Sequence, residues 1–287
     1  MPELPEVESL ARYLAEQTGG QRIARFDVAA FHALKTFDPP ADALVGRTVT
    51  GTDRRGKFLV VTAEPLHLVL HLARGGWVKW HEALPTARPR PGAKGPLALR
   101  VGFEGGGGFD VTEAGTELRL AAYVVRELDD VEGIARLGPD PLDPSFDAAA
   151  LGQALREHGG QLKGALTTQS VVAGVGNAYS DEALHAARLS PFKAADKLTD
   201  DEVARLHEAL VTVLREAVER SAGLPAKGLK SEKRSGLRVH GRTGEPCPVC
   251  GDTVREVSFA TRSLQYCPTC QTGGKPLADR RLSRLLK

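Results

Sequence analysis

The chain's four cysteines limit its fold more than any other feature of its 287 residues. They form two C-x2-C pairs, Cys247/Cys250 and Cys267/Cys270, with sixteen residues between the pairs. This spacing is typical of a tetrahedral zinc site with four thiolate ligands. A disulfide framework needs an oxidising compartment, to which nothing in the sequence points, and a thioredoxin-type motif uses a single pair. We therefore predict one structural Zn²⁺ that holds a β-hairpin over residues 251–266.

Charge is distributed unevenly along the chain. Residues 221–287 contain 13 Lys/Arg and 5 Asp/Glu, a net charge of +8 (13 − 5), whereas the whole chain carries only +2, which leaves −6 (2 − 8) for residues 1–220. A basic end on a near-neutral chain is typical of a surface that binds the nucleic-acid backbone, and a merely solvated tail is the alternative. Arg255 and Arg262 lie inside the expected hairpin, so we predict a zinc-stabilised finger that binds nucleic acid.

Two kinds of pattern divide the chain. Short Val-, Leu- and aromatic-rich runs at 60–80, 97–103 and 116–125 predict β-strands, whereas 147–158, 180–189 and 199–221 predict helices. A Pro-rich stretch at 137–144 separates the two halves. We predict an α+β multidomain protein with a β-rich domain at 1–135, a linker at 136–149, a helical domain at 150–238, a zinc finger at 239–273 and a basic extension at 274–287.

Location follows from two absences in the sequence. No stretch approaches the ~18 unbroken apolar residues that a membrane span needs. The acidic start, MPELPEVESL, lacks the basic-then-apolar layout of a secretory signal. We therefore expect a cytoplasmic protein.

The first ten residues begin a helix. Pro5 suits the first helical position, because its missing N–H would have no partner there, and Glu6 and Glu8 suit the positive end of the helix dipole. This interpretation leaves Pro2 and Glu3 without a role.

The stretch SVVAGVGNAYSDEAL at 170–184 contains Gly174 and Gly176 but lacks the third glycine of a dinucleotide-binding motif. Two helices joined by a glycine turn fit it better. Backbone N–H groups and Asn177 at such a turn are suited to a phosphate-sized anion, and a turn without a ligand is the alternative.

Together these segments resemble the formamidopyrimidine-DNA glycosylase/endonuclease VIII family of bacterial base-excision repair enzymes. The matching stretches are MPELPEVE (1–8), RRGKFL (54–59), IARLGPDPL (134–142), QSVVAGVGNAYSDEAL (169–184), VHGRTGEPCPVCG (239–251) and RSLQYCPTCQ (262–271). The resemblance covers nearly the whole chain. It implies an N-terminal β-sandwich with flanking helices, a helix–two-turns–helix domain and a C-terminal zinc-finger β-hairpin.

The resemblance also implies an activity and its residues. A bifunctional DNA glycosylase and abasic-site lyase would lose Met1 and attack the deoxyribose of an extruded nucleotide through the nitrogen of Pro2, forming a Schiff base. Glu3 would be the general acid/base, and Glu6 would support it. The remaining implied site residues are Lys57 as a proton donor; His71, Lys163 and Asn177 as DNA contacts; and Arg262 as both a catalytic and a phosphate-binding residue. Double-stranded DNA with damaged bases or abasic sites would be the partner of a monomeric, nucleoid-associated enzyme.

Four departures from the family pattern leave the lesion open. Arg74 stands where a void-filling methionine is usual, and residues 118–128 lack the R-R-F-G segment. Residues 222–238, expected to form the loop over a flipped purine, lack its usual aromatic, and Thr168 replaces an acid. We expect Arg74 to occupy the space left by the extruded base.

Two other functions compete with the enzyme. A non-catalytic protein on the same scaffold could bind damaged DNA or abasic sites, which the altered wedge residues favour. A zinc-ribbon transcription or RNA module would account for the finger but not for the N-terminus. Pro2, Glu3, Glu6 and Lys57 favour the enzyme.

Overall fold

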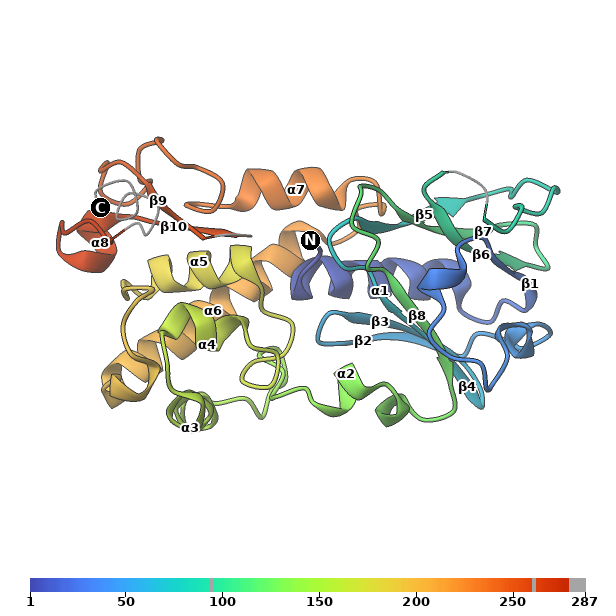
Figure 1. The fold of residues 1–287 in the computed structure, drawn as a ribbon, viewed down its shortest axis with the longest axis horizontal. Helices are drawn as coiled ribbons and strands as arrows, with labels where there is room; N and C mark the ends of the chain where they lie inside the picture. The colour runs from blue at the N-terminus through green and yellow to red at the C-terminus, as the bar shows by residue number, and fades with distance from the viewer. Residues whose placement is uncertain (93–94, 260–261, 279–287) are drawn as a thin grey trace. The chain divides into compact units, whose positions relative to one another are not determined.

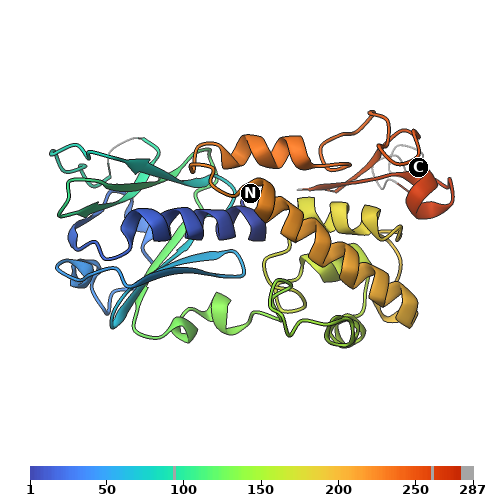
Figure 2. The ribbon, with the colours of Figure 1, turned by 180° about the vertical axis from the view of Figure 1, so that it is seen from behind.

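The computed structural model describes residues 1–92, 95–259 and 262–278, and its chain divides into two compact units. Unit 1 contains residues 1–136 and 221–230; unit 2 contains 137–220 and 231–287. Figures 1 and 2 show the elements of each unit from opposite sides. Most of the expected basic extension, 279–287, lies outside the described residues.

Unit 1 is built on two four-stranded antiparallel sheets. One has the order β1 (Ile23–Val28), β6 (Leu97–Phe103), β7 (Gly108–Glu113), β5 (Gly76–His81); the other has the order β2 (Gly51–Arg55), β3 (Phe58–Ala63), β4 (Leu66–His71), β8 (Ala121–Val125). Alternating residues of both sheets enter a single apolar core. This arrangement confirms the predicted N-terminal β-sandwich.

Helix α1 (Leu4–Thr18) completes this core. Val7, Leu10, Ala11 and Leu14 recur at helical spacing and are buried in the same cluster as the strand residues. The 3-10 helices η1 (Phe31–Ala33) and η2 (Ala41–Leu44) lie in the chain between β1 and β2, which belong to different sheets. A third 3-10 helix, η3 (Leu128–Asp130), and helix α2 (Glu132–Ala135) follow β8.

Unit 2 consists of helices followed by a small hairpin. Its elements are α3 (Ala148–His158), α4 (Leu162–Thr167), α5 (Asn177–Ala186), η4 (Ala195–Lys197), α6 (Asp200–Arg220), β9 (Arg255–Ser258), β10 (Ser263–Tyr266) and α8 (Pro268–Thr272). Between α4 and α5 the chain makes a double turn. Gln169 holds this turn, because its Oε1 accepts from Gly174 N at 3.0 Å and its Nε2 donates to Val175 O at 2.8 Å. The predicted helix–two-turns–helix arrangement and the β-hairpin are therefore present.

Residues 222–238 differ from the expected loop. They contain helix α7 (Leu229–Gly236), and residues 221–230 group with unit 1 rather than with the helical domain. Burial of apolar side chains explains why this segment groups with unit 1, because Ala226 and Leu229 are buried in the sandwich core. Trp77 of β5 reinforces the attachment by donating its Nε1–H to Ala226 O at 3.0 Å. The Nζ of Lys230 lies 4.6 Å from the centre of the Trp77 ring, a cation–π contact.

None of the helices in the described part of the chain combines the length and the apolar character that crossing a bilayer requires.

Candidate active site and zinc centre

The start of α1 is a closed, buried arrangement. Pro2, Glu3 and Glu6 are all buried, and Glu3 occupies the N-cap position. The backbone N–H of Glu3 donates to Oε2 of Glu6 at 2.8 Å, half of a reciprocal capping box. Glu6 thus fixes how the chain enters the helix and places Pro2 at the positive end of the helix dipole.

A buried arginine ties α1 to the neighbouring hairpin. Nε of Arg54, whose side chain is 6% exposed, donates to Oε2 of Glu8 at 3.0 Å. Its Nη1 also donates to Gly56 O at 3.3 Å, in the turn between β2 and β3. Gly56 has a φ of +54°, which favours glycine. Both residues of the Arg54–Glu8 pair lie in the stretches that carry the family resemblance. Sequence reasoning gave Glu8 a role only at the helix dipole and did not predict its pairing with Arg54.

That turn places Lys57 in a buried position. Lys57 is 8% exposed, and the next residue, Phe58, pairs with His71 across β3 and β4. The centroids of the Phe58 and His71 rings are 4.9 Å apart. Burial, reinforced by the charge of Lys57, lowers the pKa of His71 to about 4. His71 is therefore a neutral, packed strand histidine beside Lys57 near pH 7.

Arg74 lies at the tip of a very tight connection between the two sheets. A Cβ on Gly75 would come within 2.0 Å of Ala114 O, and one on Gly76 within 2.2 Å of Leu72 O. Ala73 adopts a φ of +48°, which is costly for a residue with a Cβ. The turn is therefore shaped by backbone packing, and it leaves the Arg74 side chain 58% exposed, with Glu117 at 4.0 Å.

In unit 2, Lys163 serves an internal role. It is 8% exposed, and its Nζ donates to Asn177 O (2.6 Å), Ser180 Oγ (2.8 Å) and Asp181 Oδ1 (2.6 Å). An ammonium group has three N–H donors, so Lys163 holds the first turn of α5 in place. We expect any effect of Lys163 on DNA binding to come through that turn.

Asn177 and Arg262 lie at one small pocket with Lys163. The pocket has a volume of about 70 Å³ and joins the start of α5 to the finger hairpin. Nδ2 of Asn177 donates to Ser263 O at 2.7 Å. Arg262 is exposed, and its carbonyl accepts from Phe259 N at 2.7 Å across the hairpin loop. The structure thus brings together three residues that the sequence places up to 99 positions apart (262 − 163).

Two buried acids in α5, which sequence reasoning missed, fasten this helix to the finger. Glu182 accepts from the backbone N–H groups of residues 238, 239 and 240 at 2.8–2.9 Å. Burial raises the pKa of Glu182, although these hydrogen bonds oppose the rise. Asp181 accepts from Gln265 N at 3.2 Å and contacts Nδ1 of His240 at 2.7 Å. The sequence signal was a pair of adjacent acids, Asp181 and Glu182, within the predicted helix 180–189.

The four cysteines form the predicted metal centre. Their sulfur atoms all lie within 4.8 Å of one another, with Cys250–Cys267 at 3.3 Å and Cys247–Cys270 at 3.9 Å. Zn–S bonds of about 2.3 Å in a tetrahedron require sulfurs about 3.8 Å apart, so the residues fit a zinc ion. Burial raises the pKa of the Cys267 thiol to about 11, and a bound dication reverses this by favouring thiolate. Four sulfurs fill the coordination sphere, so the predicted single structural zinc site is confirmed.

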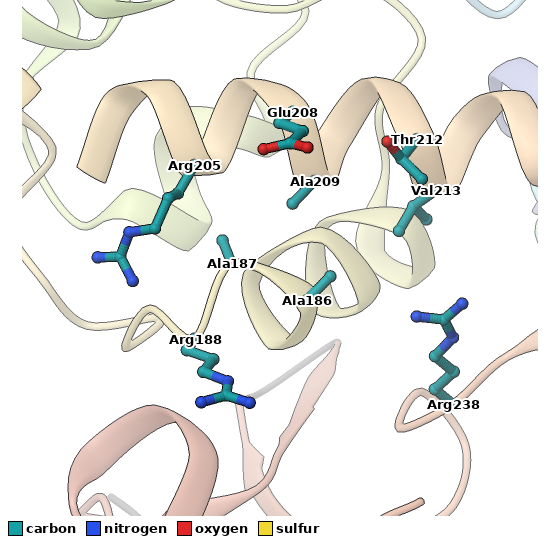
Figure 3. Close-up of a pocket in the computed structure, with 9 residues that line it drawn as sticks. All are labelled: Ala186, Ala187, Arg188, Arg205, Glu208, Ala209, Thr212, Val213 and Arg238. Atoms are coloured by element: carbon teal, nitrogen blue, oxygen red, sulfur yellow. The ribbon is translucent and has the colours of Figure 1, made fainter. Parts of the chain in front are cut away.

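Unit 2 also has a hollow of about 460 Å³ where α5 ends against α6. Figure 3 shows Arg188, Arg205 and Arg238 around it, with Ala187 and Ala209 between the helices. Arg188 has a φ of +56°. None of the predicted site residues lines this hollow.

Three family models match the chain. Residues 1–116 match the formamidopyrimidine-DNA glycosylase N-terminal domain, 137–226 match the formamidopyrimidine-DNA glycosylase H2TH domain, and 244–273 match the zinc finger found in FPG and IleRS. The chain is 37% identical to the formamidopyrimidine-DNA glycosylase of Symbiobacterium thermophilum, over 94% of this chain and 89% of that protein.

Solved structures of proteins from the same family also match the fold of this chain. The MutM (Fpg) protein of Thermus thermophilus has a TM-score of 0.79 and 34% identity, over 96% of this chain and 100% of that one. The Lactococcus lactis formamidopyrimidine-DNA glycosylase, bound non-covalently to DNA containing an AP site, has a TM-score of 0.80 and 27% identity, over 94% of this chain and 99% of that one. The resemblance identified in the sequence is confirmed.

Proposed function

Because the chain belongs to the formamidopyrimidine-DNA glycosylase family, we propose that it excises oxidised or ring-opened bases from double-stranded DNA and then cleaves the strand at the abasic site. Its relatives are named as DNA glycosylases, and a structural neighbour holds abasic-site DNA. The enzyme would act as a monomer on the bacterial nucleoid. The names of the relatives support the glycosylase step. The strand-cleaving step is proposed beyond what those names state.

The nucleophile would be Pro2 after removal of Met1. While Met1 is present the nitrogen of Pro2 is an amide and cannot attack, whereas a free α-amino group has a pKa near 8, against about 10.4 for lysine. Unprotonated amine therefore exists at neutral pH, and the positive end of α1 increases its fraction. Attack on C1′ breaks the bond to the base, which leaves with the proton of the amine. Protonation of the deoxyribose ring oxygen then lets the C1′–O4′ bond break, which opens the sugar ring and leaves an iminium ion.

The iminium ion would drive strand cleavage. Its positive charge withdraws electrons, so the C2′ proton can be removed and the 3′ C–O bond breaks; a second elimination breaks the 5′ C–O bond. Glu3, buried beside Pro2, would protonate the deoxyribose ring oxygen and later accept protons. Lys57 would donate a proton from its place in the same unit.

Phosphate binding would fall to unit 2. The start of α5 offers backbone N–H groups and the positive end of a ten-residue helix. Arg262 is exposed at the adjoining pocket, where its guanidinium can form bidentate hydrogen bonds with a phosphate. His71, packed and neutral, would act on DNA only through the position of its neighbours.

The burial of Pro2 and Glu3 at the capped start of α1 is the observation that carries this proposal. Borohydride trapping on an abasic-site duplex tests it, after mass spectrometry has shown that Met1 is absent. We expect a covalent adduct that Pro2→Gly abolishes and that Pro5→Ala, a second proline of the same helix start, retains. Tight binding without any adduct would support the alternative, a non-catalytic protein that binds damaged DNA.

A further inference from the structure

A histidine from helix α5 touches the metal centre without belonging to it. Nε2 of His185 lies 3.2 Å from Sγ of Cys247, and the two residues are 2% and 3% exposed. Both belong to unit 2. The set of ligand atoms that lie within 4.8 Å of one another contains the four cysteine sulfurs and not His185. The histidine therefore contacts a ligand of the metal rather than the metal.

The contact determines which nitrogen of His185 carries the proton. A metal-bound cysteine is a thiolate, and a thiolate accepts hydrogen bonds but cannot donate them. The nitrogen that faces it must therefore be Nε2–H. The opposite tautomer would direct a lone pair of Nε2 at the sulfur and leave a proton on Nδ1. Nδ1 is buried and has no hydrogen-bond partner among the described residues, and a buried N–H without a partner is the costlier state.

A side chain also holds the second cysteine pair in place, through the backbone of Cys267. The backbone N–H of Cys267 donates to Oε1 of Gln271 at 2.9 Å, and Nε2 of Gln271 donates to Leu189 O at 3.0 Å. Leu189 follows α5 in the chain, close to His185. The first pair is thus tied to α5 through His185, and the second is tied through Gln271 to Leu189, which follows α5.

We propose that His185 is a positioning residue of the zinc centre, donating its Nε2–H to the Cys247 thiolate. Four thiolates on one Zn²⁺ carry a net charge of −2, and a hydrogen bond from a fixed imidazole stabilises that charge and holds the Cys247 side chain in its ligating orientation. Groups that orient metal ligands in this way typically contribute ~10–100-fold in metal affinity. The end of α5 then sets how strongly the finger retains its metal.

Competition with a chromophoric zinc chelator tests this on the full-length, zinc-loaded protein. We expect His185→Phe, which keeps a planar ring but has no donor, to weaken zinc affinity ~10–100-fold. His185→Gln keeps an N–H near the same place and should restore part of the loss. His207→Phe is the matched control: His207 bonds a backbone carbonyl, Phe146 O, at 2.9 Å in the same unit, and its loss should leave zinc affinity unchanged.

A second readout needs no variant to fold. In ¹⁵N NMR spectra of the zinc-loaded wild-type protein, we expect the His185 ring to show a protonated Nε2 and a bare Nδ1. A third readout uses the variants: in the Co²⁺-substituted protein, His185→Phe should shift the sulfur-to-metal charge-transfer band, and His207→Phe should not. A protonated Nδ1 with a bare Nε2, or a His185→Phe protein with wild-type zinc affinity, would overturn the proposal. None of these three measurements involves DNA, so failure here is distinguishable from failure of the proposed glycosylase activity.

Discussion

The carboxylate of Glu6 accepts a hydrogen bond from the backbone N–H of Glu3 at 2.8 Å. This bond joins two acids to which the family resemblance gives catalytic and supporting roles. Through it, the side chain of Glu6 holds the backbone of Glu3, the N-cap residue, at the start of α1. A glutamine at this position can keep a capping box, whereas an alanine cannot. The two substitutions therefore separate the structural role of Glu6 from the role of its charge.

We expect Glu6→Ala to lower the free energy of unfolding by about 1 kcal/mol, the usual effect of losing a cap, and Glu6→Gln to lower it by much less. Urea unfolding measures both. Incision of abasic-site DNA by Glu6→Gln then reports on charge alone. If both variants matched the wild type in stability, the capping role would be wrong.

Arg74 should affect lesion processing and not folding. Its side chain is 58% exposed and its ion-pair distance to Glu117 is 4.0 Å, so Arg74→Ala should change stability by less than about 0.5 kcal/mol. Extruding a base costs a few kcal/mol and needs a group to fill the space. We expect slower excision of an oxidised base from a duplex, with incision of an abasic site nearly unchanged. Equal excision rates for the variant and the wild type would rule out this role.

His71 should make stability depend on pH. Its folded-state pKa is lowered to about 4, whereas an unfolded histidine titrates near 6.5. Between these values the unfolded chain binds more protons, so stability falls as the pH drops from about 6.5 to about 4, by up to roughly 3 kcal/mol for this group. Urea midpoints between pH 4 and pH 7 measure the slope. His71→Gln should flatten it, and an unchanged slope would contradict the assignment.

The Lys163–Asp181 pair is expected to support the structure strongly. Removing one partner of a buried ion pair costs ~3–5 kcal/mol, because the other charge stays buried. We therefore expect Lys163→Met to lower the free energy of unfolding by about that amount. Arg136→Met, which removes an exposed partner of Glu132, should cost less than about 1 kcal/mol. Thermal unfolding compares the two, and similar losses would show that burial adds nothing to the Lys163 pair.

The features that could be predicted from the sequence are those fixed by residues close together in the chain. The zinc site follows from cysteine spacing, and α1 follows from an apolar repeat and its proline, because both signals lie within a few residues. The internal bonding of Lys163 could not be predicted, since its acceptors Asn177, Ser180 and Asp181 face it only once the double turn has formed. The placement of residues 221–230 depends on Trp77, far away in the chain, and a search for loop-type composition cannot detect that contact.

The assignment of Ala226 and Leu229 to the sandwich core has a consequence for biosynthesis. Unit 1 resumes at residue 221 after the whole of α3–α6, so a ribosome must deliver those helices before the sandwich receives its last apolar side chains. A nascent chain that stops near residue 136 would carry strands β1–β8 without Ala226 and Leu229, the two buried apolar residues that this later segment adds to the core. The N-terminal unit consequently gains its last core contacts only after α3–α6 of the other unit have been synthesised.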